Sequence, residues 1–334
     1  MALPRIHVLA LGGTIAMAGE TGPGVTPQLS AHELLAATPG LGEVAEVHAE
    51  QLRQVPSAAL GFADVLSLAE RVTALVAEGA AGVVVTQGTD TLEETAFLLD
   101  LLLDLSEPVV VTGAMRPASV PGADGPASLL AAVQVAASRS ARGAGVLVVV
   151  DDQIHAAARV RKSRASAPGA FASPDTGPLG WVAEGEVHLL AVPRDRRQVP
   201  PVDPEVLSRV RVPVVPVQLD DDGTLIEAVL ERVRAGRGPE GLVVEALGAG
   251  NVPARLVEPL AELARAIPVV LASRTGAGRV HTATYGYPGG GVELVGAGLL
   301  PAGWLDARKA RIVLALLLSA REPLSREQIA RQLG

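Results

Sequence analysis

The sequence VVVTQGTDTLEETA occupies residues 83–96 and says most about the fold to expect. A run of β-branched residues stops at a Gly turn, a hydroxyl and a carboxylate follow at Thr89 and Asp90, and an amphipathic helical pattern begins. Residues 8–16, VLALGGTIA, have the same design, with Thr14 just past an apolar strand. In open α/β sheets, ligands bind at the carboxyl ends of strands, where turns and helix N-termini present backbone N–H groups. The two stretches therefore predict a sheet edge with two threonines suited to nucleophilic chemistry on a small polar substrate.

Length and composition exclude several classes of protein. A chain of 334 residues suits two domains, because single cores rarely grow beyond roughly 250–300 residues. Hydrophobic residues make up 49%, so a substantial core is available. The net charge of −8 and the few aromatic rings argue against nucleic acid as a partner. The lack of Cys excludes disulfides and thiolate catalysis, and no apolar run approaches the roughly 20 residues that a membrane span needs.

Strand and helix patterns alternate through the first part of the chain. Apolar runs typical of buried strands occupy Ile6–Leu11, Val83–Thr86, Val109–Thr112 and Val146–Asp151. Helical patterns occupy Ala31–Ala37, Ala63–Glu78, Leu92–Asp104 and Ala127–Ser138. Strands that are apolar on both faces are typical of a parallel sheet covered by helices. We therefore expect residues 1–191 to form a larger α/β domain with a doubly wound, mostly parallel sheet that carries both threonines.

A second α/β pattern follows a break. Residues 192–212 contain four prolines and clustered charge without a period, which is typical of a linker. Strand patterns then occupy Val214–Leu219, Leu242–Leu247 and Pro268–Ala272. Helical patterns occupy Leu225–Ala235, Ala254–Arg265, Asp306–Leu318 and Ser325–Leu333. Residues 213–334 are therefore expected to form a smaller, Rossmann-like α/β domain.

The residues alone leave two interpretations of each threonine. Thr14 follows a Gly-Gly turn, where a Thr commonly caps a helix by accepting hydrogen bonds from its free N–H groups. Residues 17–27 contain three Gly and two Pro, which is typical of a mobile loop and weakens the capping interpretation. Thr89 and Asp90 also precede a helix, and a carboxylate there stabilises the helix dipole. Capping and chemistry are compatible, because the turn backbone and the side chains face the same crevice.

Lys162 is a candidate for proton transfer on composition alone. Only Lys162 and Lys309 among the 28 basic residues are lysine. A chain that uses Arg almost everywhere retains Lys where Arg cannot serve, and a desolvated Lys can lose its proton whereas Arg effectively never does. A relay with Thr89 and Asp90 requires such a group. Chance retention is the alternative, and Lys309 in a helical pattern receives no chemical role.

Several stretches together resemble the bacterial L-asparaginase (asparaginase/glutaminase) family. GGTIA at 12–16 and QGTDTLEET at 87–95 are similar to its two signatures. Further family-like text follows in the family's order: TGAMRP at 112–117, ADGP at 123–126, GPLG at 177–180 and KAR at 309–311. The resemblance implies hydrolysis of L-asparagine to L-aspartate and ammonia without a cofactor, with activity on L-glutamine left open. It also implies a homodimer or homotetramer whose sites are shared between subunits.

The resemblance also implies catalytic roles for the matching residues. Thr14 is the expected nucleophile, which forms a β-acyl-threonine, and residues 17–27 are the expected lid that excludes bulk water. Thr89, Asp90 and Lys162 are expected to position the attacking water, and Asp90 also pairs with the substrate's α-ammonium group. These four side chains must therefore converge on one crevice.

Binding roles are implied for four further positions. Backbone N–H groups near Gly13 and Gly88 are expected to stabilise the oxyanion. Ser57 matches the serine that binds the substrate carboxylate. Asn251 resembles an asparagine lent to the neighbouring subunit's site, although a Gly-rich turn with an Asn in the left-handed region explains the same pattern.

One departure from the family concerns the lid tyrosine that assists the first threonine. No Tyr lies between residues 16 and 31, and Gln87 replaces the usual His. The resemblance brings a Gly-rich stretch, residues 274–291, to the site across the dimer. Tyr285 or Tyr287 in that stretch, or the nearby Glu293, is therefore the expected substitute for the missing hydroxyl.

Other motifs are incomplete. Neither lysine follows G-x-x-x-x-G, and no Gly-rich turn completes G-x-G-x-x-G, which excludes a Walker A loop and a dinucleotide fingerprint. The histidines show no pair at metal-binding spacing, so we expect no metal site. They stand at positions 7, 32, 48, 155, 188 and 281.

Two alternative functions and one alternative location remain. A non-catalytic amino-acid-binding sensor on the same scaffold fits the missing lid Tyr, whereas both threonines, Asp90 and Lys162 favour an enzyme. The D subunit of archaeal glutamyl-tRNA amidotransferase shares these motifs but carries an extra N-terminal domain. Arg5 and the apolar stretch up to Ala18 loosely resemble a signal peptide, but cleavage there would remove Thr14, so a cytoplasmic location is expected.

Overall fold

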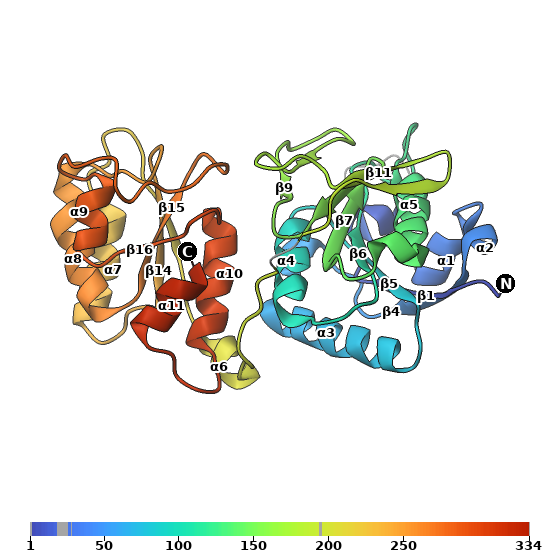
Figure 1. The fold of residues 1–334 in the computed structure, drawn as a ribbon, viewed down its shortest axis with the longest axis horizontal. Helices are drawn as coiled ribbons and strands as arrows, with labels where there is room; N and C mark the ends of the chain where they lie inside the picture. The colour runs from blue at the N-terminus through green and yellow to red at the C-terminus, as the bar shows by residue number, and fades with distance from the viewer. Residues whose placement is uncertain (1, 19–25, 28, 194–195, 334) are drawn as a thin grey trace. The chain divides into compact units, whose positions relative to one another are not determined.

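The computed structural model describes residues 2–18, 26–27, 29–193 and 196–333, and its ribbon is drawn in Figure 1. The chain divides into two compact units, Met1–Gln198 and Val199–Gly334. This division falls inside the segment 192–212 that the sequence predicts to be a linker. The segment also contains a helix that we did not predict, α6 (Pro204–Arg209). Its six residues are too few to show a period, but the Asp203 carboxylate accepts hydrogen bonds from two N–H groups of its first turn.

The larger unit is built on an eight-stranded sheet with the order β12-β11-β8-β7-β6-β5-β1-β4. Five neighbouring strands are parallel. They are β7 (Val146–Val150), β6 (Val109–Thr112), β5 (Gly82–Thr86), β1 (Arg5–Ala10) and β4 (Glu46–Gln51). The remaining three run antiparallel to their neighbours. They are β8 (Gln153–Ala156), β11 (Gly180–Ala183) and β12 (Glu186–Leu189).

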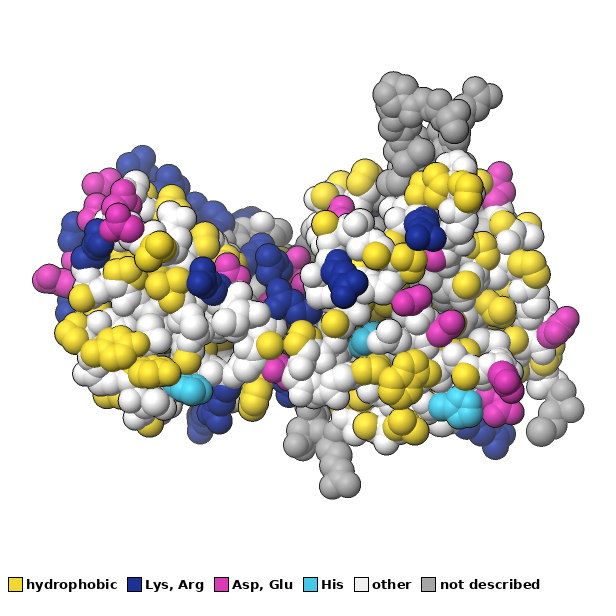
Figure 2. Space-filling view, turned by 90° about the horizontal axis from the view of Figure 1, so that it is seen from above, with side chains coloured by type: hydrophobic (Ala, Val, Ile, Leu, Met, Phe, Trp, Pro, Cys, Tyr) yellow, Lys and Arg dark blue, Asp and Glu magenta, His cyan; other side chains and the backbone are white. Residues whose placement is uncertain are grey.

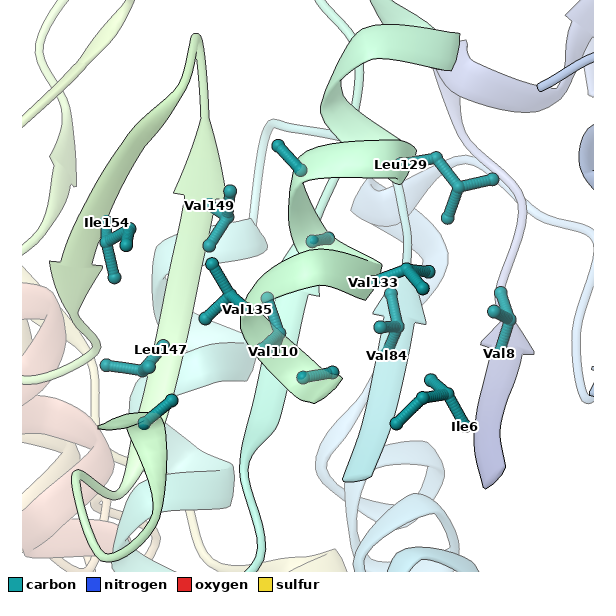
Figure 3. Close-up of a cluster of buried hydrophobic side chains, with 14 of the residues drawn as sticks. Ile6, Val8, Val84, Val110, Leu129, Val133, Val135, Leu147, Val149 and Ile154 are labelled. Carbon is teal, nitrogen blue, oxygen red and sulfur yellow. The ribbon is translucent and has the colours of Figure 1, made fainter. Parts of the chain in front are cut away.

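Helices cover both faces of this sheet, because its central strands bury apolar side chains on both sides. The helices are α1 (Ala31–Ala36), α2 (Leu41–Val44), α3 (Phe62–Ala77), α4 (Leu92–Leu102) and α5 (Gly125–Ala137). Figure 3 shows one face, where alternate strand residues meet Leu129, Val133 and Val135 of α5. The strand residues are Ile6, Val8, Val84, Val110, Leu147, Val149 and Ile154. The predicted fold class of this unit is confirmed.

The strands that the sequence analysis missed lie toward the two ends of the sheet. β4 and β12 consist of exposed and half-buried residues, so their sequences lack the continuous apolar runs of the central strands. The predicted strand Val146–Asp151 ends one residue early. Asp151 and Asp152 have φ of 51° and 57° and form the tight turn into β8, and Asp is among the few residues that tolerate this left-handed conformation.

The smaller unit has a four-stranded parallel sheet with the order β13-β14-β15-β16. Its strands are Val214–Pro216, Leu242–Ala246, Val269–Ser273 and Leu300–Pro301. Its further helices are α7 (Thr224–Arg234), α8 (Val257–Ala266), α9 (Gly291–Gly296), α10 (Ala307–Leu318) and α11 (Arg326–Leu333). In Figure 1, α7 and α8 lie on one face of the sheet and α10 on the other. This arrangement confirms the predicted α/β class.

The face of the larger unit that Figure 2 shows carries charges of both signs. In the view of Figure 2, acidic, basic and hydrophobic side chains alternate over the described part of this unit, and the basic groups stand apart from one another. Within the described ranges, no helix is both long and apolar enough to cross a membrane.

Candidate active site

The floor of the candidate site is formed by the turns that follow β1 and β5. The backbone N–H of Leu11 donates to the Thr86 carbonyl at 2.9 Å, which continues the pairing of the two strands to their ends. Gly13 then adopts a φ of 86° and lies directly against Gly88. A Cβ on Gly13 would come within 2.0 Å of the Gly88 nitrogen, so this approach requires glycine. The two turns that carry Thr14 and Thr89 therefore touch through their main chains.

Thr14 begins a short 3-10 helix, Thr14–Ala16, and is half-buried. The segment after it starts in β2 (Met17–Ala18) and returns in β3 (Thr26–Pro27), and these two strands pair antiparallel. The lid that we predict over 17–27 falls mainly on residues 19–25, which lie outside the described residues. The role of Thr14 as nucleophile stays a prediction.

Three of the four predicted catalytic side chains are in direct contact. Lys162 lies on β9 (Arg161–Lys162), which pairs with β10 (Phe171–Ala172). Its Nζ donates to Thr89 Oγ1 at 2.9 Å and to Asp90 Oδ1 at 3.0 Å. The Lys162 side chain is 16% exposed and that of Asp90 is 70% exposed, so the ammonium group is sheltered while the carboxylate remains open to a ligand. This arrangement can hold a water molecule or a substrate cation beside a buried hydroxyl.

Ser57 is 2% exposed and begins the 3-10 helix Ser57–Ala59. A Cβ on Gly88 would lie 2.8 Å from Ser57 Oγ, so the hydroxyl group borders the floor glycine. This oxygen forms no hydrogen bond within the described chain. A buried hydroxyl without a partner is destabilising, so its presence next to Gly88 is consistent with a polar ligand that completes it.

A third strand end supports the same turn. The N–H of Gln87 donates to the Thr112 carbonyl at 3.1 Å, at the end of β6. Gly113 follows, and a Cβ there would lie 2.6 Å from the Gln87 carbonyl oxygen and 3.2 Å from Thr89 Cγ2. Gln87 is fully buried and its Nε2 reaches the Gly88 carbonyl at 3.3 Å. The side chain that replaces the family's His is thus a structural part of the floor.

Glu93 was missed by the sequence analysis. It is the second residue of α4, is 7% exposed, and its carboxylate accepts a hydrogen bond from the backbone N–H of Lys162. An acidic residue in the first turn of a helix ordinarily indicates only a favourable interaction with the helix dipole. The only signal was weak, because Glu93 shares its face of the helix with Ala96 and Phe97 but also with a second acidic residue, Asp100.

The smaller unit holds the remaining predicted residues. Asn251 closes a tight turn after β14, where its N–H donates to the Leu247 carbonyl at 2.9 Å and its buried Oδ1 has no hydrogen bond within the described chain. Tyr285 lies between His281 and Tyr287, with ring centroids 6.0 and 5.6 Å away, and the Glu293 carboxylate accepts from the Gly289 N–H at 2.7 Å. The roles of these residues stay predictions.

Among the residues with described positions, no three or more His, Cys, Asp or Glu side chains are grouped to hold a metal ion.

Comparisons with known proteins cover nearly the whole chain. Residues 5–194 match the model of the asparaginase N-terminal domain, and residues 211–333 match that of the glutaminase/asparaginase C-terminal domain. A "Probable L-asparaginase" from Deinococcus radiodurans is 42% identical, over 98% of this chain and 97% of that protein. A "Probable L-asparaginase periplasmic" from Haemophilus influenzae is 34% identical, over 95% and 89%.

A solved structure agrees in fold. The probable cytoplasmic L-asparaginase from Campylobacter jejuni superimposes with a TM-score of 0.84 at 31% identity, and the match covers 99% of each chain. Two family domains in order, a relative 42% identical along its length and a shared fold lead to one conclusion. The chain belongs to the asparaginase family.

Proposed function

We propose that this chain is an amidohydrolase that converts L-asparagine and water to L-aspartate and ammonia, with Thr14 as nucleophile. The observation that carries the proposal is the pair of hydrogen bonds from Lys162 Nζ to Thr89 and Asp90, beside the turn that holds Thr14. A sheltered amine, a buried hydroxyl and an open carboxylate are the groups that hydrolysis of an amide on an amino acid requires.

In the first step, Thr14 Oγ attacks the side-chain amide carbon of asparagine. The C–O bond forms, and the negative charge on the amide oxygen is stabilised by backbone N–H groups near Gly13 and Gly88. Each such donor contributes about 3–4 kcal/mol to catalysis. The C–N bond then breaks, ammonia leaves with the proton from the threonine hydroxyl, and a β-acyl-threonine remains.

In the second step, water replaces the threonine. Thr89 and Lys162 position the water and receive its proton, while Thr14 regains a proton as the ester breaks and L-aspartate leaves. Asp90 holds the α-ammonium group with the carboxylate that it exposes, and Ser57 donates its otherwise unpaired hydroxyl to the α-carboxylate. Thr89, Lys162, Asp90 and Ser57 thus each have a task in the proposed mechanism.

The sensor and the amidotransferase subunit are less well supported. The compared proteins that match along the whole chain are named L-asparaginases. The contact between the Lys162 amine and the Thr89 hydroxyl also suits proton transfer, which a binding protein does not require. Activity on L-glutamine is a secondary expectation, because one methylene group separates the substrates and such discrimination is usually worth only about 1–3 kcal/mol.

Ammonia release and acyl-enzyme trapping test the central claim. Thr14→Ala should lower turnover of L-asparagine at least about 10⁴-fold, since the nucleophile is lost. Thr73→Ala, on the exposed face of α3, is the matched control and should keep wild-type activity. Rapid acid quench followed by mass spectrometry should find an aspartyl group on Thr14. Full activity of Thr14→Ala would refute the mechanism.

We further propose a homodimer or homotetramer in the cytoplasm, with Asn251 serving the neighbouring subunit's site. Thr14→Ala and Asn251→Ala should each be inactive alone. Mixed subunits of the two variants should regain activity, because one site in a mixed dimer then contains both native residues. No recovery after mixing would refute shared sites, and cell fractionation tests the location.

A further inference from the structure

The segment that carries the relay lysine has little support of its own. β9 and β10 are two residues each, and in the described structure they pair only with each other, not with the eight-stranded sheet. Two strands alone are only marginally stable in water. The long flexible stem of a Lys does not fix its own ammonium group either. The position of Lys162 Nζ must therefore be set by contacts from outside the hairpin.

The hydrogen bonds that hold Lys162 from outside the hairpin come from one short stretch of chain. Thr89 and Asp90 hold Nζ from the turn before α4, and Glu93 holds the backbone N–H of the same lysine from the first turn of that helix. We propose that Glu93 is a positioning residue, whose carboxylate fixes the backbone at Lys162 so that the amine reaches Thr89 and Asp90. This inference rests on the proposed function of Lys162.

The burial of Glu93 separates this role from ordinary helix stabilisation. A carboxylate that serves only the helix dipole can do so from solvent, where its hydration is retained. Glu93 is instead 7% exposed and contacts a residue 69 positions away in sequence. Burying a carboxylate is unfavourable unless it is hydrogen-bonded, and the Lys162 N–H provides such a bond.

The first measurement separates turnover from binding. Glu93→Ala should lower kcat on the order of 10- to 100-fold, because a small misplacement of a catalytic group has that effect, while KM changes little since Ser57 and Asp90 still bind substrate. Glu93→Gln keeps an acceptor oxygen in place and should restore most of the loss. Glu70→Gln, an exposed change of the same charge on α3, is the control.

The second measurement does not depend on activity. The chain has two lysines, and Lys309 is 3% exposed, so acylation by acetic anhydride reports almost solely on Lys162 among the side-chain amines. Peptide mass spectrometry gives the rate at each site. Acylation of Lys162 should be faster in Glu93→Ala than in the wild type, Glu93→Gln or Glu70→Gln, because the amine loses its fixed contacts.

The outcomes distinguish the positioning role of Glu93 from the proposed role of Lys162, on which it rests. Unchanged acylation of Lys162 in Glu93→Ala would overturn the positioning role, whatever the activity. Wild-type kcat in Glu93→Ala, combined with an inactive Lys162→Met, would also overturn it and leave the proposed function intact. Full activity of Lys162→Met would instead refute the relay itself.

Discussion

The floor of the site and the hairpin that carries Lys162 hold their residues in different ways. The floor is formed by main chain, because Gly13 and Gly88 touch at the ends of two buried parallel strands. The hairpin is a separate pair of two-residue strands that contacts the site through side chains. Thr14, the proposed nucleophile, thus follows directly on a buried strand and its turn, whereas the Lys162 side chain is held by individual polar contacts. Mutations in the floor and mutations in the hairpin should therefore affect the protein differently.

The largest effect is expected at the floor. Gly13→Ala places a Cβ within 2.0 Å of backbone and forces a side chain into a left-handed conformation, so both strain and overlap oppose folding. We expect a loss of about 3 kcal/mol or more in the free energy of unfolding, with activity abolished. Urea denaturation followed by circular dichroism measures this loss.

A glycine in open space gives the control. A Cβ at Gly42 in α2 would contact nothing within 4 Å, so Gly42→Ala should be neutral or stabilise by up to about 1 kcal/mol. Equal stability of Gly13→Ala and Gly42→Ala would contradict the close packing of the floor at Gly13.

The next effect concerns the far end of the hairpin and depends on pH. Ser173, directly after β10, contacts His155 Nδ1 at 3.0 Å, and burial lowers the pKa of His155 from 6.5 to about 4. Between these values the unfolded chain binds a proton that the folded chain does not, so the free energy of unfolding falls as pH decreases through this window. The slope is about 1.4 kcal/mol per pH unit, or about 3 kcal/mol in total.

Substitution isolates this histidine from the other titrating groups. His155→Asn should flatten the slope of stability between pH 6.5 and 4, whereas His32→Asn, at an exposed site, should leave it as in the wild type. Chemical denaturation at a series of pH values supplies the comparison. If the plots of stability against pH are parallel for both variants, His155 does not titrate in this range.

The smallest effect on stability is expected at Ser57, which borders the floor. Ser57→Ala removes a buried hydroxyl that has no partner in the described chain, so the free protein should lose no stability and gain up to about 1 kcal/mol. KM for L-asparagine should rise on the order of 10-fold, because the proposed hydrogen bond from Ser57 to the substrate's charged α-carboxylate is lost. Thermal denaturation without substrate and steady-state kinetics test both parts, and a large drop in stability would show that Ser57 serves folding.

The sequence predicted the central strands and helices to within a few residues, because buried parallel strands and amphipathic helices produce strong periodic patterns. β4 and β12 were missed because partly exposed strands lack such runs. Lys162 could be singled out by its rarity, but its contact with Thr89 was expected only from the family resemblance, because β9 lies outside the eight-stranded sheet. Glu93 could not be found in this way, since its partner is a backbone N–H 69 residues away and a pattern of side-chain types does not report such a bond.

The contact between Gly13 and Gly88 limits how this catalyst can be redesigned. A side chain at Gly13 would need the space that the Gly88 main chain occupies, and a Cβ at Gly88 would lie 2.8 Å from Ser57 Oγ and 3.2 Å from the Gly13 Cα, so neither position accepts a side chain without movement of its neighbours. Substitutions that change the preferred amide substrate must therefore be made around the edge of the crevice, because the two glycines at its centre leave no room for larger side chains.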